Sequence, residues 1–571
     1  MRVKNLASRS RPLWGAGCPR SINLLDVAPL ALLLVILVGA ALRFNGLTFG
    51  LPAVNESDEL MFELGAMKML AGKTLNPGWF GHPATTTMYL LAVLDVVVFA
   101  AGWLVGAWAD VPAFVAAMYH DPGIFMLPHR VAMVLVGLGT ILLTARIARR
   151  IWHADGDAGA HAGSLAALGA AALLAVNPVH AAWSQIIRSD GLACMFLLLC
   201  INACLDVAQH GRRRDWLRAA AWLALAIATK WPFALGALAI GGGAVLQLRA
   251  GAPIRTTFIR FALTMGMTLL LLVAVSPYLL LDYRTVLANL AGEAQPHHVG
   301  ATGGTPLENL LWYLRGPLWS GLGAGGAILA LAGLWAARRN GPVLCIVLPV
   351  AAGFVAAFML QNIVWERWTL PIMPLLAVLA GGGLVMLGRV LDGLLVRERA
   401  AVVVTAVLLL ACAPLWWNSW GRGQERLNDT RQQSVRWAHA HIPDGDSVLI
   451  EHFAFDMLDR DWPALFPLGD RGCVDAQALL AGRIKYDTVD KGRGTRSNID
   501  YGTLNPAMRP TCGADWAILS QADRYASEAA RFPAEHAAYR ALISSGEIVA
   551  SFYPEPRRAS GPIIRIIRFR R

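Results

Sequence analysis

The chain has 571 residues, of which 56% are hydrophobic and 15% are charged, and its formal net charge is +12. Soluble globular proteins have about a quarter of their residues charged, so this composition excludes an ordinary soluble domain and indicates a membrane protein. The excess of positive charge does not indicate nucleic-acid binding, because the basic residues lie in short clusters beside apolar runs, where they act as orientation signals.

The N-terminal segment, residues 1–24, is basic and precedes an apolar run at about residues 25–44. A small-residue cleavage site is conceivable at Gly39-Ala40, but the run continues into Leu42 and Phe44. We therefore expect a retained signal anchor rather than a cleaved signal peptide. In either case the N-terminus is expected to stay in the cytoplasm.

Apolar runs continue along most of the chain. They lie near residues 25–44, 84–108, 126–150, 161–181, 190–209, 216–229, 232–249, 257–281, 317–336, 342–360, 369–390 and 400–417. If every run crossed the membrane, the basic clusters Arg146–Arg150 and Arg212–Arg214 would lie outside. If the run 84–108 does not cross, every short basic cluster lies on the cytoplasmic side, as the positive-inside rule requires.

The charge pattern therefore predicts a polytopic α-helical membrane module over residues 25–417, with about eleven spanning helices. Segment 84–108 becomes an interfacial or re-entrant stretch within a long outer loop, 45–125. The alternative is that this segment spans the membrane and that a short helix elsewhere compensates for it.

Residues 418–571 are more polar and are predicted to form a small soluble α/β domain outside the cytoplasm. Arg431–His441 has the pattern of a helix, and strand patterns occur at Ser447–Glu451, Glu547–Tyr553 and Pro562–Phe569. Outside the cytoplasm cysteines are oxidised, so we expect a disulfide between Cys473 and Cys512.

Adjacent acids, Asp58 and Glu59, follow the first span at the start of the outer loop. Their simplest interpretation is structural: Ser57 caps a helix, and the two acids occupy its first turn. A carboxylate at the membrane surface can also activate a nucleophile or hold a divalent cation against a phosphate. Because consecutive helical residues point about 100° apart, one acid is expected to face a site and the other a structural or metal-linked partner.

Other charged residues are also predicted to lie on the outer face. They are His82, His129-Arg130, Arg188, Asp190, Lys230, His297, His298 and Arg367. Basic residues are disfavoured on this face, so they are expected to bind an anion. The alternatives are that the long basic side chains snorkel at span ends, that His82 shapes a turn with Pro83, and that His297 and His298 are ordinary loop residues. His129-Arg130 is expected to pack beneath the outer loop.

The order of these motifs resembles the GT-C class of glycosyltransferases, and is most similar to glycosyltransferase family 39 and the lipid A aminoarabinose transferases. The similarity covers about residues 25–390. The matching elements are Asp58-Glu59, His82-Pro83, Asn177-Pro178 with Arg188-Ser189-Asp190, Ala228-Thr229-Lys230-Trp231-Pro232 and Arg367-Trp368-Thr369-Leu370-Pro371, with Trp368 where tyrosine is usual.

This resemblance implies a transferase of the cell inner membrane. It would move a sugar, with inversion, from a polyprenyl-phosphate donor to a lipid, glycan or protein acceptor outside the cytoplasm. Asp58 would be the base, and Glu59 belongs to the same catalytic pair.

Within the implied site, Lys230, Arg367 and Arg188 would bind the donor phosphate. Further residues of the site would be His82, His297 and His298. Mg²⁺ or Mn²⁺ would be held by Asp58 and Asp190. Two alternative functions are a transporter or flippase of lipid-linked saccharides and a non-catalytic membrane assembly protein. A transporter is expected to show internal repeats and paired broken helices, and the sequence shows neither pattern.

Overall fold

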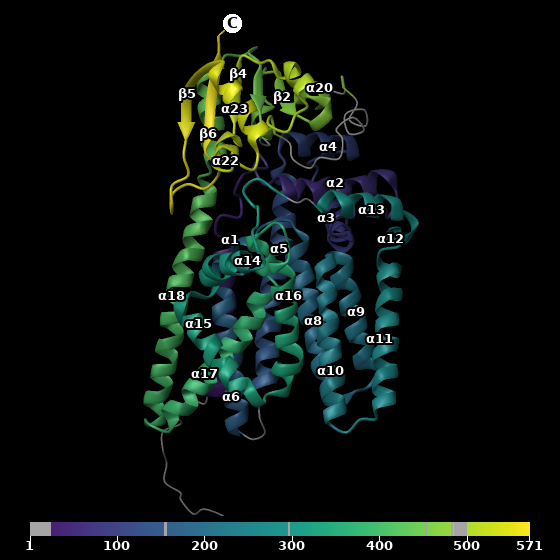
Figure 1. Cartoon of the computed structure of the whole chain (residues 1–571), viewed down its shortest axis with the longest axis vertical. Coiled ribbons are helices and arrows are strands. Elements are labelled where there is room, and N and C mark those ends of the chain that lie inside the picture. The colour runs from purple at the N-terminus through teal and green to yellow at the C-terminus, as the bar shows by residue number, and fades with distance from the viewer. Residues whose placement is uncertain are drawn as a thin grey trace, which may run out of the picture.

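The structure is a computed structural model that describes residues 24–153, 157–294, 297–451, 454–480, 483–484 and 500–570. The basic N-terminal segment lies outside these residues, apart from Leu24, which begins the first helix. In Figure 1 the long helices form an upright bundle, and a β-sheet domain sits above one end of it.

The upright helices are α1 (Leu24–Phe44), α5 (Gly123–Trp152), α6 (Asp157–Ala175), α8 (Ser189–His210), α9 (Arg213–Thr229), α10 (Ala237–Arg249), α11 (Ile254–Val275), α15 (Trp319–Ala336), α16 (Leu348–Met359), α17 (Ile372–Asp392) and α18 (Arg397–Leu427). Some of the upright helices are joined by short turns, whereas longer segments with helices of their own join α1 to α5 and α11 to α15. The turns from α10 to α11 and from α17 to α18 lie at the end of the bundle opposite the sheet domain (Figure 1). The helix ends beside these turns carry Arg249, Arg255, Arg397 and Arg399, so the basic clusters there lie on the face away from that domain.

Within the described residues, eight helical segments are long and apolar enough to cross a membrane, judged by length and composition. All but Thr85–Leu104 are spans that the sequence predicted. Shorter apolar helices occupy three further predicted spans, at Pro29–Phe44, Gly159–Ala175 and Val343–Met359. The predicted class, a polytopic helical membrane protein, is confirmed, and the count of eleven spans stays a prediction.

The outer loop folds into α2 (Ser57–Gly72), α3 (Thr85–Leu104) and α4 (Val111–His120). Figure 1 shows α2 and α4 lying across the bundle beneath the sheet domain, and α3 close to end-on behind them. Phe99, near the end of α3, packs against Phe114 of α4, with ring centroids 5.6 Å apart. The start of α3 is bound to the end of α9, because the Ala84 N–H donates to the Thr229 carbonyl at 3.1 Å. α3 therefore begins beside the end of α9 and ends beside α4. Since α3 is also long and apolar enough to span, the expectation that 84–108 does not cross stays a prediction.

Small residues bring the helices of the bundle close together. A Cβ added at Gly333 of α15 would lie 1.7 Å from the Leu379 carbonyl of α17, and one added at Gly383 would lie 1.9 Å from the Leu329 carbonyl. Only glycine permits such an approach, which is the usual way in which membrane helices gain packing contacts. α15 and α17 therefore form a tight central pair.

The last upright helix, α18, continues to Leu427 rather than ending near the predicted residue 417, and it leads directly into the C-terminal domain. That domain contains the predicted helix as α19 (Thr430–His441). The three predicted strands are β1 (Val448–Ile450), β5 (Gly546–Phe552) and β6 (Ile564–Phe569). The other elements are β2 (Ala464–Pro467), β3 (Cys473–Asp475), α20 (Ala476–Leu480), β4 (Trp516–Leu519), α22 (Ala522–Ser527) and α23 (Pro533–Ser544).

The strand order of the sheet is β3-β2-β1-β4-β6-β5. β1 pairs in parallel with β2 and β4, and the remaining pairs are antiparallel. Alternate residues of β4 point into separate apolar cores: Ala517 and Leu519 on one face, and Trp516 and Ile518 on the other. Cys473 of the edge strand β3 and Cys512, the pair expected from the sequence, form a disulfide.

Polar contacts fix the C-terminal domain on the outer loops. Arg431 of α19 donates from Nη1 to the Asn55 carbonyl at 2.6 Å. Glu528, which follows α22, accepts from the Gly300 N–H at 2.6 Å and from the Thr302 hydroxyl at 3.0 Å. The domain therefore covers the face on which the acidic pair lies.

Candidate active site

The two adjacent acids lie at the start of α2, which begins at Ser57 with Glu56 in the N-cap position and no side-chain capping bond from Glu56. The structure therefore differs from the capping interpretation of Ser57. The Asp58 side chain is 38% exposed and that of Glu59 is fully buried. One acid is thus accessible to a substrate, while the other belongs to the interior.

Glu59 forms a two-point ion pair with Arg130 of α5. Arg130 donates from Nε to Oε1 at 2.9 Å and from Nη2 to Oε2 at 2.6 Å. Arg130 also donates to the carbonyls of Leu47 and Phe49, and the Ile187 N–H donates to Glu59 at 3.0 Å. Glu59 therefore joins α2, α5 and the segment before α8, and Arg130 packs beneath the outer loop as expected.

Asp58 faces a group of buried charges. Its carboxylate forms an ion pair with Arg188, whose Nε lies 3.5 Å from Asp190. Lys230 donates from Nζ to the other oxygen of Asp190 at 2.5 Å. The side chains of Arg188, Asp190 and Lys230 are all at least nine-tenths buried. An accessible carboxylate thus borders an enclosed network of alternating charge.

The positions of these residues follow from the helix ends. Arg188 is the N-cap of α8, Asp190 lies in its first turn, and Lys230 caps the end of α9. The N-terminal end of a helix carries a partial positive charge, so α8 adds to the attraction for an anion.

His82 is fastened to the same place by backbone hydrogen bonds. The Trp231 N–H donates to the His82 carbonyl at 2.9 Å, and Pro83 forms a β-bridge with Lys230. The His82 Nδ1 lies 3.3 Å from the Ser189 hydroxyl. Burial, together with the charge of Lys230, lowers the pKa of His82 to about 3. The imidazole is therefore neutral at physiological pH and acts as a hydrogen-bonding group beside Asp190.

Arg367 reaches the group from the turn η5 (Glu366–Thr369), between α16 and α17. Its guanidinium lies over the Trp365 ring, 4.1 Å from the centroid, and its buried Nε has no hydrogen-bond partner among the described residues. Its charge acts on both Asp190 and Arg188. Arg367 is thus a buried cation with an unused donor.

The two loop histidines differ in position. The His298 ring lies 5.1 Å from the Trp365 ring, the same indole on which Arg367 stacks. Its Nδ1 donates to the Val299 carbonyl at 2.9 Å. His297 is exposed. His298 therefore lies at the border of the site, one side chain away from Arg367.

One acidic residue near the site, Glu293, was not predicted from the sequence. Glu293 lies at the end of α13 (Tyr283–Glu293), and a Cβ on Gly81 would lie 2.9 Å from its Oε1. Burial raises the pKa of Glu293, and the charges of Arg188 and Arg367 oppose that rise. Glu293 therefore lies beside the His82 segment, where the cations act on it. It is the last residue of a short helix, so the helical period does not continue beyond it to indicate the direction of its side chain.

The surroundings of Asp58 and Asp190 fit an anion better than a cation. Each carboxylate is paired with a basic group, and Lys230, Arg188 and Arg367 all act on Asp190. Among the described residues, one group of three potential metal ligands is close enough to share an ion, and it consists of Glu63, Asp95 and His129. A divalent ion at Asp58 and Asp190 would have to displace these basic partners.

Comparisons with known proteins agree with this architecture. Residues 123–280 match the model of the family described as dolichyl-phosphate-mannose-protein mannosyltransferase. No curated protein sequence matches the chain. The crystal structure of the Archaeoglobus fulgidus oligosaccharyltransferase tethered with an acceptor peptide superposes with a TM-score of 0.51 at 10% identity, covering 94% of this chain and 74% of that chain.

Crystal structures of ArnT from Cupriavidus metallidurans are also similar, in the apo state and bound to undecaprenyl phosphate. Both have a TM-score of 0.49 at 14% identity, cover 94% and 95% of this chain, and are themselves covered over 97% of their length. The match to the archaeal enzyme shows a common fold, and the family match falls within the region where the motifs were found. The resemblance to the GT-C glycosyltransferases is confirmed at this level.

Proposed function

We propose that this protein is a membrane glycosyltransferase that moves a sugar from a polyprenyl-phosphate donor to an acceptor outside the cytoplasm. The observation that carries the proposal is the accessible Asp58 carboxylate bordering the buried cations Arg188 and Lys230, with Arg367 alongside. The reaction needs a base for the acceptor hydroxyl and a binding site for the donor phosphate, and a carboxylate beside buried cations can provide both. The family model matched by residues 123–280 is named for a dolichyl-phosphate sugar donor.

The proposed reaction is a single displacement at the anomeric carbon. The acceptor oxygen forms a bond to this carbon as the bond to the donor phosphate oxygen breaks. The electron pair of the broken bond goes to the lipid phosphate, and the proton of an acceptor hydroxyl goes to Asp58. Attack opposite the leaving group inverts the configuration of the carbon.

The cations stabilise the negative charge that grows on the departing phosphate. Arg367 has a buried donor that finds no partner among the described residues, and Lys230 and Arg188 both contact Asp190. When a phosphate arrives, it would share these donors with Asp190, which then positions Lys230 and Arg188. Enclosure strengthens each interaction because little water screens it.

The donor and acceptor are expected to approach from different directions. A lipid-linked donor reaches the site from the bilayer, along the outer ends of α8 and α9. The acceptor, which can be a lipid, a glycan or a protein, would enter between the outer loop and the C-terminal domain. We propose that the protein resides in the cell inner membrane, with this domain on the side away from the cytoplasm.

The test is a transfer assay with a radiolabelled polyprenyl-phosphate sugar and purified full-length protein. Asp58→Asn removes the base but keeps the shape of the side chain, so the turnover rate should fall by about 10²–10⁴-fold. The amount of protein in the membrane and its thermal stability should stay close to those of the wild type.

Asp110→Asn is the matched control, because Asp110 lies in the same outer loop and accepts from the Ala113 N–H as an N-cap. Asparagine caps helices equally well, so this variant should keep wild-type activity. Full activity of Asp58→Asn would contradict the assignment of Asp58. Saccharide movement without transfer in wild-type protein would favour a flippase instead.

A further inference from the structure

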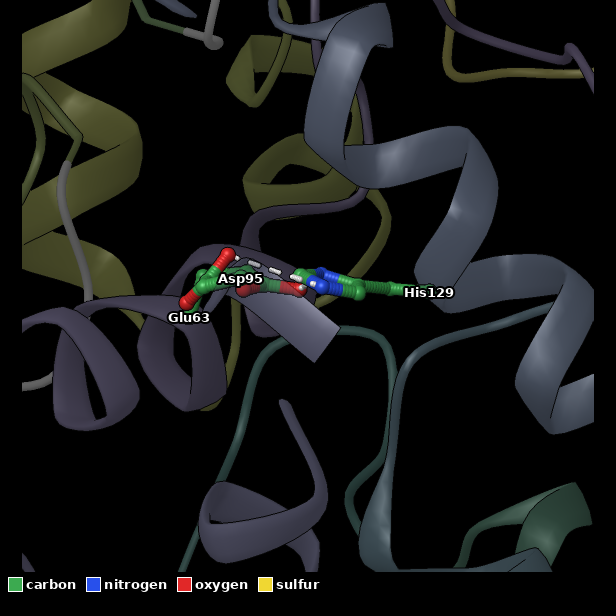
Figure 2. A group of neighbouring side chains, drawn as sticks. All are labelled: Glu63, Asp95 and His129. Carbon is green, nitrogen blue, oxygen red and sulfur yellow. Dashed lines mark hydrogen bonds and ion pairs between the residues drawn. The ribbon is translucent and has the colours of Figure 1, made fainter. Parts of the chain in front are cut away.

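A second polar cluster lies below the acidic pair, where α2, α3 and α5 meet. Figure 2 shows the Glu63 and Asp95 carboxylates converging on the His129 imidazole. Glu63 and His129 are fully buried, and Asp95 is 3% exposed. The Glu63 Oε1 lies 2.7 Å from Nδ1 of His129, and the Asp95 Oδ1 lies 3.5 Å from Nε2. Three ionisable groups are therefore enclosed in an apolar setting.

With both carboxyl groups ionised, the cluster has an excess of negative charge. Its two carboxylates face one histidine, and the adjacent Arg130 is already committed to Glu59. Four buried atoms have no hydrogen-bond partner among the described residues: Oε2 of Glu63, both carboxylate oxygens of Asp95, and Nε2 of His129. Enclosed and unpaired polar atoms are costly, so this arrangement calls for a positively charged partner that binds oxygen and nitrogen.

The separations match a metal ion better than a direct hydrogen bond. A distance of 3.5 Å between Nε2 and Oδ1 exceeds the usual range for an N–H···O bond, about 2.7–3.2 Å. Two ligand bonds of about 2.1 Å at a nearly tetrahedral angle place the ligand atoms about 3.5 Å apart. One ligand atom from each of the three residues lies within 4.8 Å of the others.

We propose that Asp95 and His129 bind a zinc ion, with Glu63 holding the imidazole. Nδ1–H of His129 donates to Glu63, which leaves Nε2 free to face the metal, as in the carboxylate–histidine–metal arrangement. Two carboxylates, a neutral imidazole and Zn²⁺ sum to zero charge, so the ion removes the imbalance. A mixed nitrogen and oxygen donor set with an imidazole favours zinc over Mg²⁺ or Ca²⁺.

The site would act as a clamp on the outer loop. Glu63 lies one helical turn after Glu59 on α2, and His129 precedes Arg130 on α5. Zinc would tie α3 to the α2–α5 contact and so fix the helix whose first turn carries Asp58. This ion is separate from the proposed reaction, and its test does not depend on activity.

The experiment measures zinc bound by the purified full-length protein, first stripped with a chelator and then incubated with Zn²⁺ and washed. About one zinc per chain is expected in the wild type, together with a higher melting temperature, because a ligand that binds only the folded state stabilises it. Asp95→Asn should retain no stoichiometric zinc, and zinc should not raise its melting temperature. Asp110→Asn, in the same loop, should behave as the wild type does.

Glu63→Gln gives a second measurement if Asp95→Asn folds poorly. It leaves both direct ligands in place and weakens the hold on the imidazole, so zinc affinity should fall by about 10–100-fold. Cobalt substituted in the wild type should show visible absorption that depends on His129. The proposal is overturned if the wild type binds no zinc above Asp95→Asn. It is also overturned if both variants bind zinc as the wild type does, or if zinc leaves the melting temperature unchanged.

Discussion

Two adjacent carboxylates at the start of α2 have different surroundings because successive helical side chains diverge by about 100°. Asp58 faces Arg188 at the accessible border of the cluster, whereas Glu59 is fully buried against Arg130. Asp58 is therefore the accessible acid of the pair, as the proposed role of base requires. Glu59 and Arg130 hold α2 against α5, which fixes the direction in which Asp58 points.

The buried ion pair between Glu59 and Arg130 leads to a prediction about the stability of the protein. Removing one partner of a buried ion pair leaves an uncompensated charge and costs about 3–5 kcal/mol, whereas replacing both partners is far less costly. Glu59→Gln should lower the melting temperature of the purified protein, and Glu59→Gln with Arg130→Met should recover part of the loss.

A measurement of transfer activity distinguishes this structural role of Glu59 from a direct role in the reaction. Glu59→Gln should keep most of its turnover rate per folded molecule at a temperature well below its melting point. A variant that melts like the wild type and yet has no transfer activity would show that Glu59 itself acts on the substrate, and would contradict the role given to it here.

The helices α2, α3 and α4, with the segments that join them, position the residues of the candidate site at one end of the bundle. They share an apolar core that includes Phe62, Met88 and Phe114. The segment between α2 and α3 carries His82 to the end of α9. If α3 crossed the membrane, α4 would lie at the opposite face from α2. The contact between Phe99 and Phe114, with α4 lying beneath the C-terminal domain, argues for the same face.

Cysteine labelling tests this arrangement. Leu75 and Val105 flank α3 and are exposed, as is Val396 in the turn before α18. In intact cells or oriented vesicles, Leu75→Cys and Val105→Cys should both react with a membrane-impermeant maleimide from the outer side, while Val396→Cys should react only after permeabilisation. Wild type is the control for labelling of native cysteines: Cys194, Cys200, Cys204 and Cys412 are buried and Cys473–Cys512 is a disulfide, whereas Cys345 is half-buried and Cys18 lies outside the described residues. Serine replaces Cys18 and Cys345 if the wild type reacts. Labelling of Val105→Cys with the pattern of Val396→Cys would show that α3 crosses.

At the scale of the whole molecule, the upright helices end in a polar face that the C-terminal domain covers. Much of this plan follows from the sequence, because the length of apolar runs sets the helices and the basic clusters set their direction. The same topology predicted that Asp58, Asp190, Lys230, His297 and Arg367 would gather on one face. These features depend on local composition or on topology, both of which a sequence expresses directly.

Pairings between distant residues could not be predicted in the same way. Glu59 with Arg130, and Glu63 with Asp95 and His129, are brought together by the way α2 and α3 lie across α5. The sequence indicates that such polar residues need hydrogen-bonding or ionic partners, but it does not indicate which residues those partners are. The order of the sheet likewise depends on packing across two cores, and the length of α18 was underestimated because its last turns are polar.

The central claim is that Lys230, Arg367 and Arg188 receive the phosphate of a lipid-linked sugar donor beside Asp58. The most direct measurement is an experimental structure of the full-length protein with a bound polyprenyl phosphate. The account predicts that the phosphate lies within hydrogen-bond distance of Arg367 and Lys230, with the lipid chain leading into the bilayer near the outer ends of α8 and α9. A phosphate bound away from these side chains, or at the opposite face of the bundle, would contradict it.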